Sequence, residues 1–164
     1  MFYLTNLTKD LSIFPSNNNI DIKTLISKKV KDLEGNINRS DGYIVSILEF
    51  KYTDGGIVDT DVGSINFKVD YKSITFKLIK GEIIKTIILF MNEHGIFCNI
   101  GPIKIFISRY TLKDDWLYDI DKNIWSSKKH DKILKIDDVV IVNILETRIN
   151  SNEIVSIGTL NCKY

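Results

Sequence analysis

The sequence contains little of what several common classes of protein require. It has two cysteines in 164 residues, and Cys98 and Cys162 stand far apart without CxxC or Cys/His spacing, so neither a zinc site nor a disulfide framework is indicated. No apolar run approaches the roughly 18 residues that a membrane helix needs. The first residues lack the basic start and apolar stretch of a signal peptide. We therefore expect an intracellular protein with no membrane partner.

An excess of one charge is also missing. The formal net charge is +1, from 22 basic and 21 acidic side chains. A protein that binds nucleic acid through bulk positive charge needs a much larger excess. Any contact with nucleic acid is therefore expected to be local and modest. The hydrophobic fraction of 44% is that of an ordinary globular protein, and the length suits one large domain or two small ones.

The residue types that carry catalysis are few and are not arranged as a site. His94 and His130 are the only histidines, and His94 precedes a glycine typical of a turn. Cys98 alternates onto the apolar face of a predicted strand, where a thiol usually acts as a small hydrophobic group. The acidic pairs at 114–115 and 137–138 favour turns or caps over a paired-carboxylate site. With no phosphate-binding glycine loop either, we expect no catalytic residue, no metal and no cofactor.

The stretch from 91 to 109 is the most informative part of the chain. It predicts two short strands joined by a Gly-Pro turn, and the side chains of a strand alternate between its two faces. One face carries isoleucines and Cys98. The other face carries a mixed set of aromatic, amide, hydroxyl and basic side chains: Phe97, Asn99, Lys104, Phe106 and Ser108.

This mixed face has two interpretations. Aromatic rings beside a cation are what single-stranded nucleic acid uses, with bases stacked on the rings and phosphates held by charge. Alternatively, another element covers the face and Phe97 and Phe106 belong to the core. The barrel predicted for the second half of the chain favours the nucleic-acid interpretation.

The first half predicts a small α+β unit. Residues 2–14 alternate loosely as a strand that ends at Pro15, and from Ile22 to Leu33 the apolar residues recur at helical spacing. Asn19 or Asp21 is expected to cap that helix.

An antiparallel meander follows the predicted helix. Strands are predicted at 43–52 and 64–72, separated by glycine-containing turns. The alternation shifts at Ser73, which predicts a β-bulge or bend in the second strand.

The second half predicts a small barrel after a boundary at Lys80-Gly81-Glu82. Strands are expected at 83–90, 95–100 and 103–107, and two more at 139–145 and 153–160, with an irregular stretch between. Five short strands with a long connection before the last two suit an OB-type barrel, whose second and third strands bind oligonucleotides. Trp116, Tyr118 and Trp125 in the irregular stretch are expected to pack it onto the barrel.

The chain resembles, over nearly its whole length, the stalk subunit of RNA polymerase II, the seventh-largest subunit of that enzyme. The resemblance rests on many short matches in order rather than on one motif. In the first half they include Met1-Phe2-Tyr3, Pro15, Glu34-Gly35, Gly42-Tyr43, Gly56, Gly63, Tyr71-Lys72 and Phe76. In the second half they are Lys80 to Ile84, Gly95-Ile96-Phe97, Ile100-Gly101-Pro102, Phe106 to Arg109, Glu146 to Asn150 and Ile157 to Leu160.

The resemblance implies a truncated ribonucleoprotein-like (RNP-like) tip domain at residues 1–79 and an OB-fold RNA-binding domain at 80–164. It also implies a non-catalytic nuclear subunit that forms a heterodimer with the polymerase's fourth subunit. The tip domain would contact the polymerase II core near the clamp, and the OB domain would touch nascent single-stranded RNA. The residues expected to bind RNA are Phe97, Asn99, Lys104, Phe106, Arg109 and Arg148. Those expected in the core-contacting loops are Gly35, Arg39, Gly42, Gly56 and Gly63.

The chain departs from the family pattern at three places. The usual Gly-Lys-aromatic-Gly of the tip loop is replaced by Arg39-Ser40-Asp41-Gly42, and an aromatic-Gly-Pro segment after Pro15 is replaced by residues 17–20. Related RNA-binding domains often carry a histidine where Phe106 stands. Two alternatives therefore remain: a free-standing OB-fold RNA-binding accessory factor, and the paralogous stalk subunit of polymerase I or III.

Overall fold

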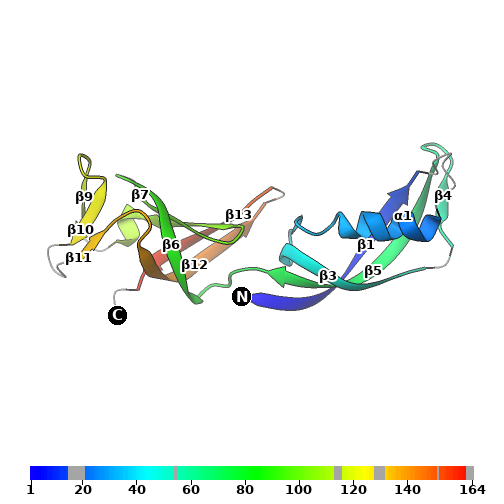
Figure 1. Cartoon of the computed structure of the whole chain (residues 1–164), viewed down its shortest axis with the longest axis horizontal. Coiled ribbons are helices and arrows are strands. Elements are labelled where there is room, and N and C mark those ends of the chain that lie inside the picture. The colour runs from blue at the N-terminus through cyan, green and yellow to red at the C-terminus, as the bar shows by residue number, and fades with distance from the viewer. Residues whose placement is uncertain (15–20, 54, 113–115, 128–131, 151, 162–164) are drawn as a thin grey trace. The chain divides into compact units, whose positions relative to one another are not determined.

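The structure is a computed structural model that describes residues 1–14, 21–53, 55–112, 116–127, 132–150 and 152–161. The chain divides into two compact units. The first is Phe2–Lys77, and the second is Leu78–Tyr164 together with Met1. The described strands of each unit pair only with one another (Figure 1).

The first unit is an antiparallel sheet with one helix on it. Its strands lie in the order β1-β5-β3-β2, and β4 also pairs with β5. The helix α1 (Ile22–Lys31) begins at Asp21, whose carboxylate accepts a hydrogen bond from the amide of Lys23, and it lies along one face of the sheet (Figure 1). The strands are β1 (Phe2–Ile13), β2 (Ile37–Asn38), β3 (Gly42–Tyr52), β4 (Ile57–Asp59) and β5 (Ser64–Phe76).

The helix is held by the apolar face that the alternation predicts. Ile26 and Val30 of α1 are buried against Val69 and Tyr71 of β5 and their neighbours in the core of this unit. Burying such side chains stabilises a unit of this size by roughly 1.5–3 kcal/mol each. Pro15 and Asn19 lie outside the described residues.

The predicted bulge at Ser73 is wrong in its location. β5 pairs with β1 without interruption from Phe2↔Phe76 to Ile13↔Ile65, so β5 itself is regular. The irregularities are in β3, where the register shifts at Val45 and at Leu48. The alternation along β5 only looks shifted because Ser73 and Thr75 occupy buried positions, where the Thr5 hydroxyl hydrogen-bonds both.

The second unit is a closed five-stranded barrel in the order β12-β13-β8-β7-β6, with β12 pairing back to β6. Its interior is lined by alternate residues of each strand, among them the fully buried Ile88, Ile96, Ile105 and Ile154. The strands are β6 (Ile83–Asn92), β7 (Gly95–Ile100), β8 (Ile103–Ser108), β12 (Val139–Ile149) and β13 (Ile154–Leu160). The predicted fold class, an RNP-like α+β unit followed by an OB barrel, is confirmed.

The connection between β8 and β12 is not irregular as predicted. After the 3₁₀ turn η1 (Arg109–Thr111) it forms a three-stranded antiparallel sheet in the order β11-β10-β9. Trp116 and Trp125 are buried, as expected, and the Trp125 ring packs on Tyr118 at a centroid distance of 5.4 Å. These strands escaped prediction because each has only three or four residues: β9 (Trp116–Asp119), β10 (Ile124–Ser127) and β11 (Lys132–Leu134).

No helix within the described ranges is long and apolar enough to cross a membrane.

Candidate nucleic-acid interface

The outer surface of the barrel carries a row of phenylalanine rings across three neighbouring strands. Phe97 of β7 pairs with Phe106 of β8, and their ring centroids lie 4.7 Å apart. On its other side Phe97 pairs with Phe90 of β6, with ring centroids 5.8 Å apart. We call Phe90, Phe97 and Phe106 the aromatic row. Residues Phe90 and Phe97 are 51% and 36% exposed, so the row is a surface feature and not core.

A second row runs parallel to the first, one step along the strands. Asn99 of β7 pairs with Lys104 of β8, Lys104 with Val155 of β13, and Val155 with Arg148 of β12. We call this the cation row. Asn99 and Lys104 each lie two residues from a ring of the aromatic row on their own strands, so alternation places them on the same outer surface. The cross-strand register through Val155 continues that surface to Arg148. The structure thus brings five of the six predicted RNA-binding residues onto one surface: Phe97, Asn99, Lys104, Phe106 and Arg148.

Both cations of this row already have carboxylate partners. The ammonium of Lys104 lies 3.0 Å from a carboxylate oxygen of Glu153, which immediately precedes β13. The guanidinium of Arg148 donates to the carboxylate of Glu146 at 3.1 Å. All four side chains are largely exposed, so each pair contributes at most about 1 kcal/mol and is readily exchanged for another anion.

Arg109 lies apart from the two rows. It follows the end of β8 in the 3₁₀ turn η1, and its backbone amide donates to the carbonyl of His94. Its side chain is exposed, but it is not in register with Lys104 or Arg148.

Phe90 is the member of the surface that the sequence did not reveal. Strict alternation from Ile84, Thr86 and Ile88, all buried, would place Phe90 inside the barrel. A β-bulge at Leu89 shifts the register, so that Phe90 faces out and Met91 faces in. The only signal in the sequence was the run of apolar residues from 87 to 91, in which alternation cannot be read.

Gly95 allows β7 and β8 to approach closely beneath the aromatic row. A Cβ atom at this position would lie 2.2 Å from the carbonyl oxygen of Ile107 and 2.9 Å from the Phe106 ring. Any side chain here would therefore displace Phe106 or separate the two strands. The glycine that opens β7 is thus required by the geometry of the surface itself.

Two catalytic candidates of the sequence that the structure describes are a buried thiol and an exposed histidine. Cys98 is buried in the barrel, and burial raises the pKa of its thiol to about 12, so the nucleophilic thiolate is not formed near neutral pH. His94 is exposed in the turn between β6 and β7, as predicted. No cluster of histidine, cysteine and acidic residues suited to a metal occurs in the described part of the chain. His130 and the pair at 114–115 lie outside the described residues.

The glycines predicted for the core-contacting loops divide into two groups. At Gly42, with φ of +88°, a Cβ would lie 2.6 Å from the carbonyl oxygen of Phe76, and at Gly56 a Cβ would lie 2.3 Å from Ile65. Internal packing of the first unit therefore accounts for these two. At Gly35 and Gly63 a Cβ would meet nothing closer than 3.7 Å, so internal packing does not account for these two glycines.

The loop around β4 is unusually apolar for an exposed segment. Ile57, Val58 and Val62 are each more than 60% exposed, and Gly63 closes the turn after them. Arg39 is exposed in the other predicted loop, two residues after β2 begins.

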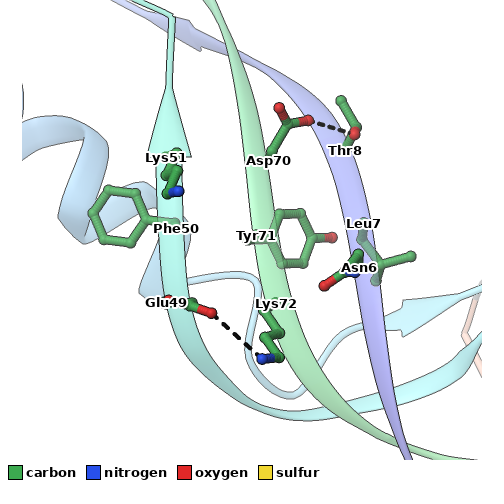
Figure 2. A pocket seen from close by; sticks show the side chains of 9 residues that line it. All are labelled: Asn6, Leu7, Thr8, Glu49, Phe50, Lys51, Asp70, Tyr71 and Lys72. Carbon is green, nitrogen blue, oxygen red and sulfur yellow. Dashed lines mark hydrogen bonds and ion pairs between the residues drawn. The ribbon is translucent and has the colours of Figure 1, made fainter.

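The first unit also has a shallow hollow over the middle of its sheet (Figure 2). Its charged groups are two lysines, Lys51 and Lys72, and two carboxylates, Glu49 and Asp70. Lys72 lies 3.5 Å from the carboxylate of Glu49, and the hydroxyl of Thr8 donates to Asp70. The hollow therefore shows no concentration of one charge for a ligand.

A closed five-stranded barrel with a second, smaller sheet inserted between its third and fourth strands in the sequence defines a class of protein, the OB-fold proteins. The family model described as the S1 RNA binding domain matches residues 77–157. That match runs from before β6 into β13 and includes the three-stranded sheet between β8 and β12.

Relatives extend the similarity to the entire chain. The chain is 30% identical to DNA-directed RNA polymerase II subunit rpb7 of Dictyostelium discoideum, over 100% of this chain and 97% of the relative. It is 29% identical to subunit RPB7 of Glycine max, over 98% and 92%. It is also 31% identical to RNA polymerase V subunit 7 of Arabidopsis thaliana, over 56% and 52%.

The chain belongs to the family of the seventh subunit of RNA polymerase II, whose members are non-catalytic subunits of the enzyme. The resemblance seen in the sequence is thereby confirmed.

Proposed function

We propose that the barrel of this polymerase subunit binds nascent single-stranded RNA on the outer surface of β7 and β8. The observation that carries the proposal is the exposed Phe97–Phe106 pair, which lies one step from Asn99 and Lys104. Apolar rings on a solvated barrel surface are unfavourable unless something covers them, and a base provides a flat partner of suitable size.

The chemistry of the surface sets the kind of RNA it binds. Stacking on a phenyl ring accepts any base, since every base has a π face, and it contributes about 1–3 kcal/mol per base. Phosphates are attracted to Lys104 and Arg148, which exchange their exposed carboxylate partners for the RNA backbone. Asn99 supplies a donor and an acceptor for a base edge or a 2′-hydroxyl. We therefore expect weak, sequence-tolerant binding.

A double variant tests the RNA proposal. Phe97→Ala/Phe106→Ala removes both rings, and we expect it to weaken binding of a labelled single-stranded oligouridine by at least tenfold in a fluorescence anisotropy titration. The variant must retain the circular dichroism spectrum and the melting temperature of the parent to within a few degrees. RNA binding equal to that of the folded parent would show that this surface is not the site.

We further propose that the first unit pairs with the fourth subunit of the polymerase and contacts the core. Support comes from the apolar side chains that this unit exposes, among them Phe2, Leu4 and Leu48, each more than half exposed. Within the described residues β1 is an edge strand that pairs only with β5. The exposed apolar loop around β4 is suited to docking on the core near the clamp.

Affinity purification from native nuclei with mass spectrometry tests the assembly. We expect the tagged chain to recover the large polymerase II subunits and one small partner. A Val58→Asp variant places a charge on the β4 loop, and we expect it to retain the small partner and lose the core. Recovery of subunits of another polymerase would correct the paralogue, and recovery of ribosomes or decay factors alone would favour a free-standing RNA-binding factor.

A further inference from the structure

The third ring of the aromatic row is held outside the barrel by a specific device. On β6, the register with β7 passes from Ile88↔Cys98 to Phe90↔Phe97, which leaves Leu89 as the extra residue of a β-bulge. Bulges re-aim the side chains that follow them and are frequent beside functional sites. Here the bulge turns Phe90 to the surface and Met91, which is 1% exposed, into the core.

The exposure of the rings rises toward Phe90. Phe106 is partly buried, Phe97 is 36% exposed and Phe90 is 51% exposed. Phe97 has a ring on each side, at 4.7 and 5.8 Å, whereas in the described part of the chain Phe90 contacts only the ring of Phe97. The ring with the most area available to a base is therefore Phe90.

The outer side of Phe90 is also free of a paired strand. β6 pairs with β12 from Ile83 to Ile87, and its last backbone bonds on that side join Ile88 to residues 137 and 138. Beyond Ile88, no described residue pairs with β6 on the side away from β7. An RNA strand that crosses the sheet from β8 over β7 can thus continue over β6.

We infer that Phe90 is a base-stacking residue, and that the aromatic row holds one more unpaired base than Phe97 and Phe106 hold together. The inference rests on the proposed RNA-binding function and extends its site onto β6. Three observations support it: the cross-strand register of the three rings, the bulge that exposes Phe90, and the side of β6 beyond Ile88 that pairs with no described strand. Sheet surfaces that bind RNA commonly stack two or three bases on aromatic side chains.

The bulge supplies a matched control for the test. Leu89 and Phe90 are adjacent, both apolar and both 51% exposed, but only Phe90 belongs to the aromatic row. We would compare Phe90→Ala, Phe90→Leu, Phe90→Trp and Leu89→Ala in the full chain. The probes are labelled oligouridines of two to eight nucleotides, and the affinity of each is measured by fluorescence anisotropy.

We expect Phe90→Ala and Phe90→Leu to weaken binding of the eight-nucleotide probe about tenfold, Phe90→Trp to preserve it, and Leu89→Ala to leave it unchanged. The loss should be smaller for the dinucleotide, which Phe97 and Phe106 hold without the third ring. Equal affinities for Phe90→Ala and Leu89→Ala would overturn the role of Phe90, while the proposed function would stand if Phe97→Ala/Phe106→Ala still abolished binding. Failure of the parent chain to bind RNA would overturn both.

Discussion

Single residues decide whether a nearly neutral protein can bind RNA on the proposed surface. The cation row lies on the outside of a barrel whose charges are otherwise balanced, and Lys104 and Arg148 each stand within 3.1 Å of a carboxylate oxygen. These carboxylates neutralise the cations in the free protein and compete with phosphate. In the proposed function, RNA binding is therefore an exchange of one anion for another, and its strength is expected to depend on Glu153 and Glu146 as well as on the basic residues.

Removing one of these competing carboxylates should strengthen RNA binding. Glu153→Gln keeps the shape of the side chain but frees Lys104 for phosphate, and we expect the dissociation constant for oligouridine to fall about threefold. Glu49→Gln is the control, because it removes an exposed carboxylate from a lysine ion pair in the first unit and changes the net charge equally. An equal gain in both variants would assign the effect to overall charge.

Burial of Cys98 gives a pH dependence that can be measured directly. Its pKa is raised by burial from 9.0 to about 12, so the folded state favours the neutral thiol. The associated stability is fully present below pH 9 and is lost as the pH rises from about 9 toward 12. We expect Cys98 in the folded protein to resist iodoacetamide at pH 9, with peptide mass spectrometry separating it from Cys162. Rapid alkylation of Cys98 without unfolding would contradict its burial.

At the level of strands and turns, bulges decide which side chains reach the surface. The bulge in β6 exposes Phe90, and the two shifts in β3 fall at Val45 and Leu48, which are 40% and 55% exposed. In each case an apolar residue leaves the core because the register changes by one. The surface of the molecule is therefore set by a few irregular positions in otherwise regular strands.

Two glycines of the first unit, Gly42 and Gly63, allow the effect of packing to be separated from the effect of backbone conformation. Gly42 has φ of +88° and no room for a Cβ beside the carbonyl of Phe76, so Gly42→Ala should lower the free energy of unfolding by about 2–3 kcal/mol in a urea titration. Gly63 also has positive φ, +70°, but open space around it, so Gly63→Ala should cost only about 1 kcal/mol. Similar losses of unfolding free energy in both variants would show that the backbone near Phe76 shifts to accommodate the new Cβ at little energetic cost.

The regular parts of this fold could be read from the sequence, and the irregular parts could not. Clean alternation in β7 and β8 is enough to place Phe97, Asn99, Lys104 and Phe106 on one face. Alternation fails where both residues around a bulge are apolar, as at Leu89 and Phe90, and where polar residues fill buried positions, as at Ser73. Ion pairs such as Lys104–Glu153 join residues 49 positions apart, which no local pattern reveals.

For the molecule as a whole, the low net charge and the small number of cations beside the aromatic row limit how the proposed RNA binding responds to salt. The net charge is +1, so there is no general field to attract RNA, and the attraction comes from Lys104, Arg148 and at most one further cation such as Arg109. Each phosphate neutralised in a single strand contributes about 0.7 to the slope of log K against log salt.

The salt dependence of RNA binding should therefore be shallow. Two or three phosphate contacts predict a slope of about −1.4 to −2.1, which is a loss of roughly 7- to 20-fold between 50 and 200 mM salt. Stacking on the aromatic row is insensitive to salt, so Phe97→Ala/Phe106→Ala should lower affinity at every salt concentration without changing the slope. Arg148→Gln, which removes a phosphate contact, should instead make the slope shallower by about 0.7. A steep slope in the parent, beyond about −4, would require basic residues outside the cation row and would place most of the RNA contact elsewhere on the protein.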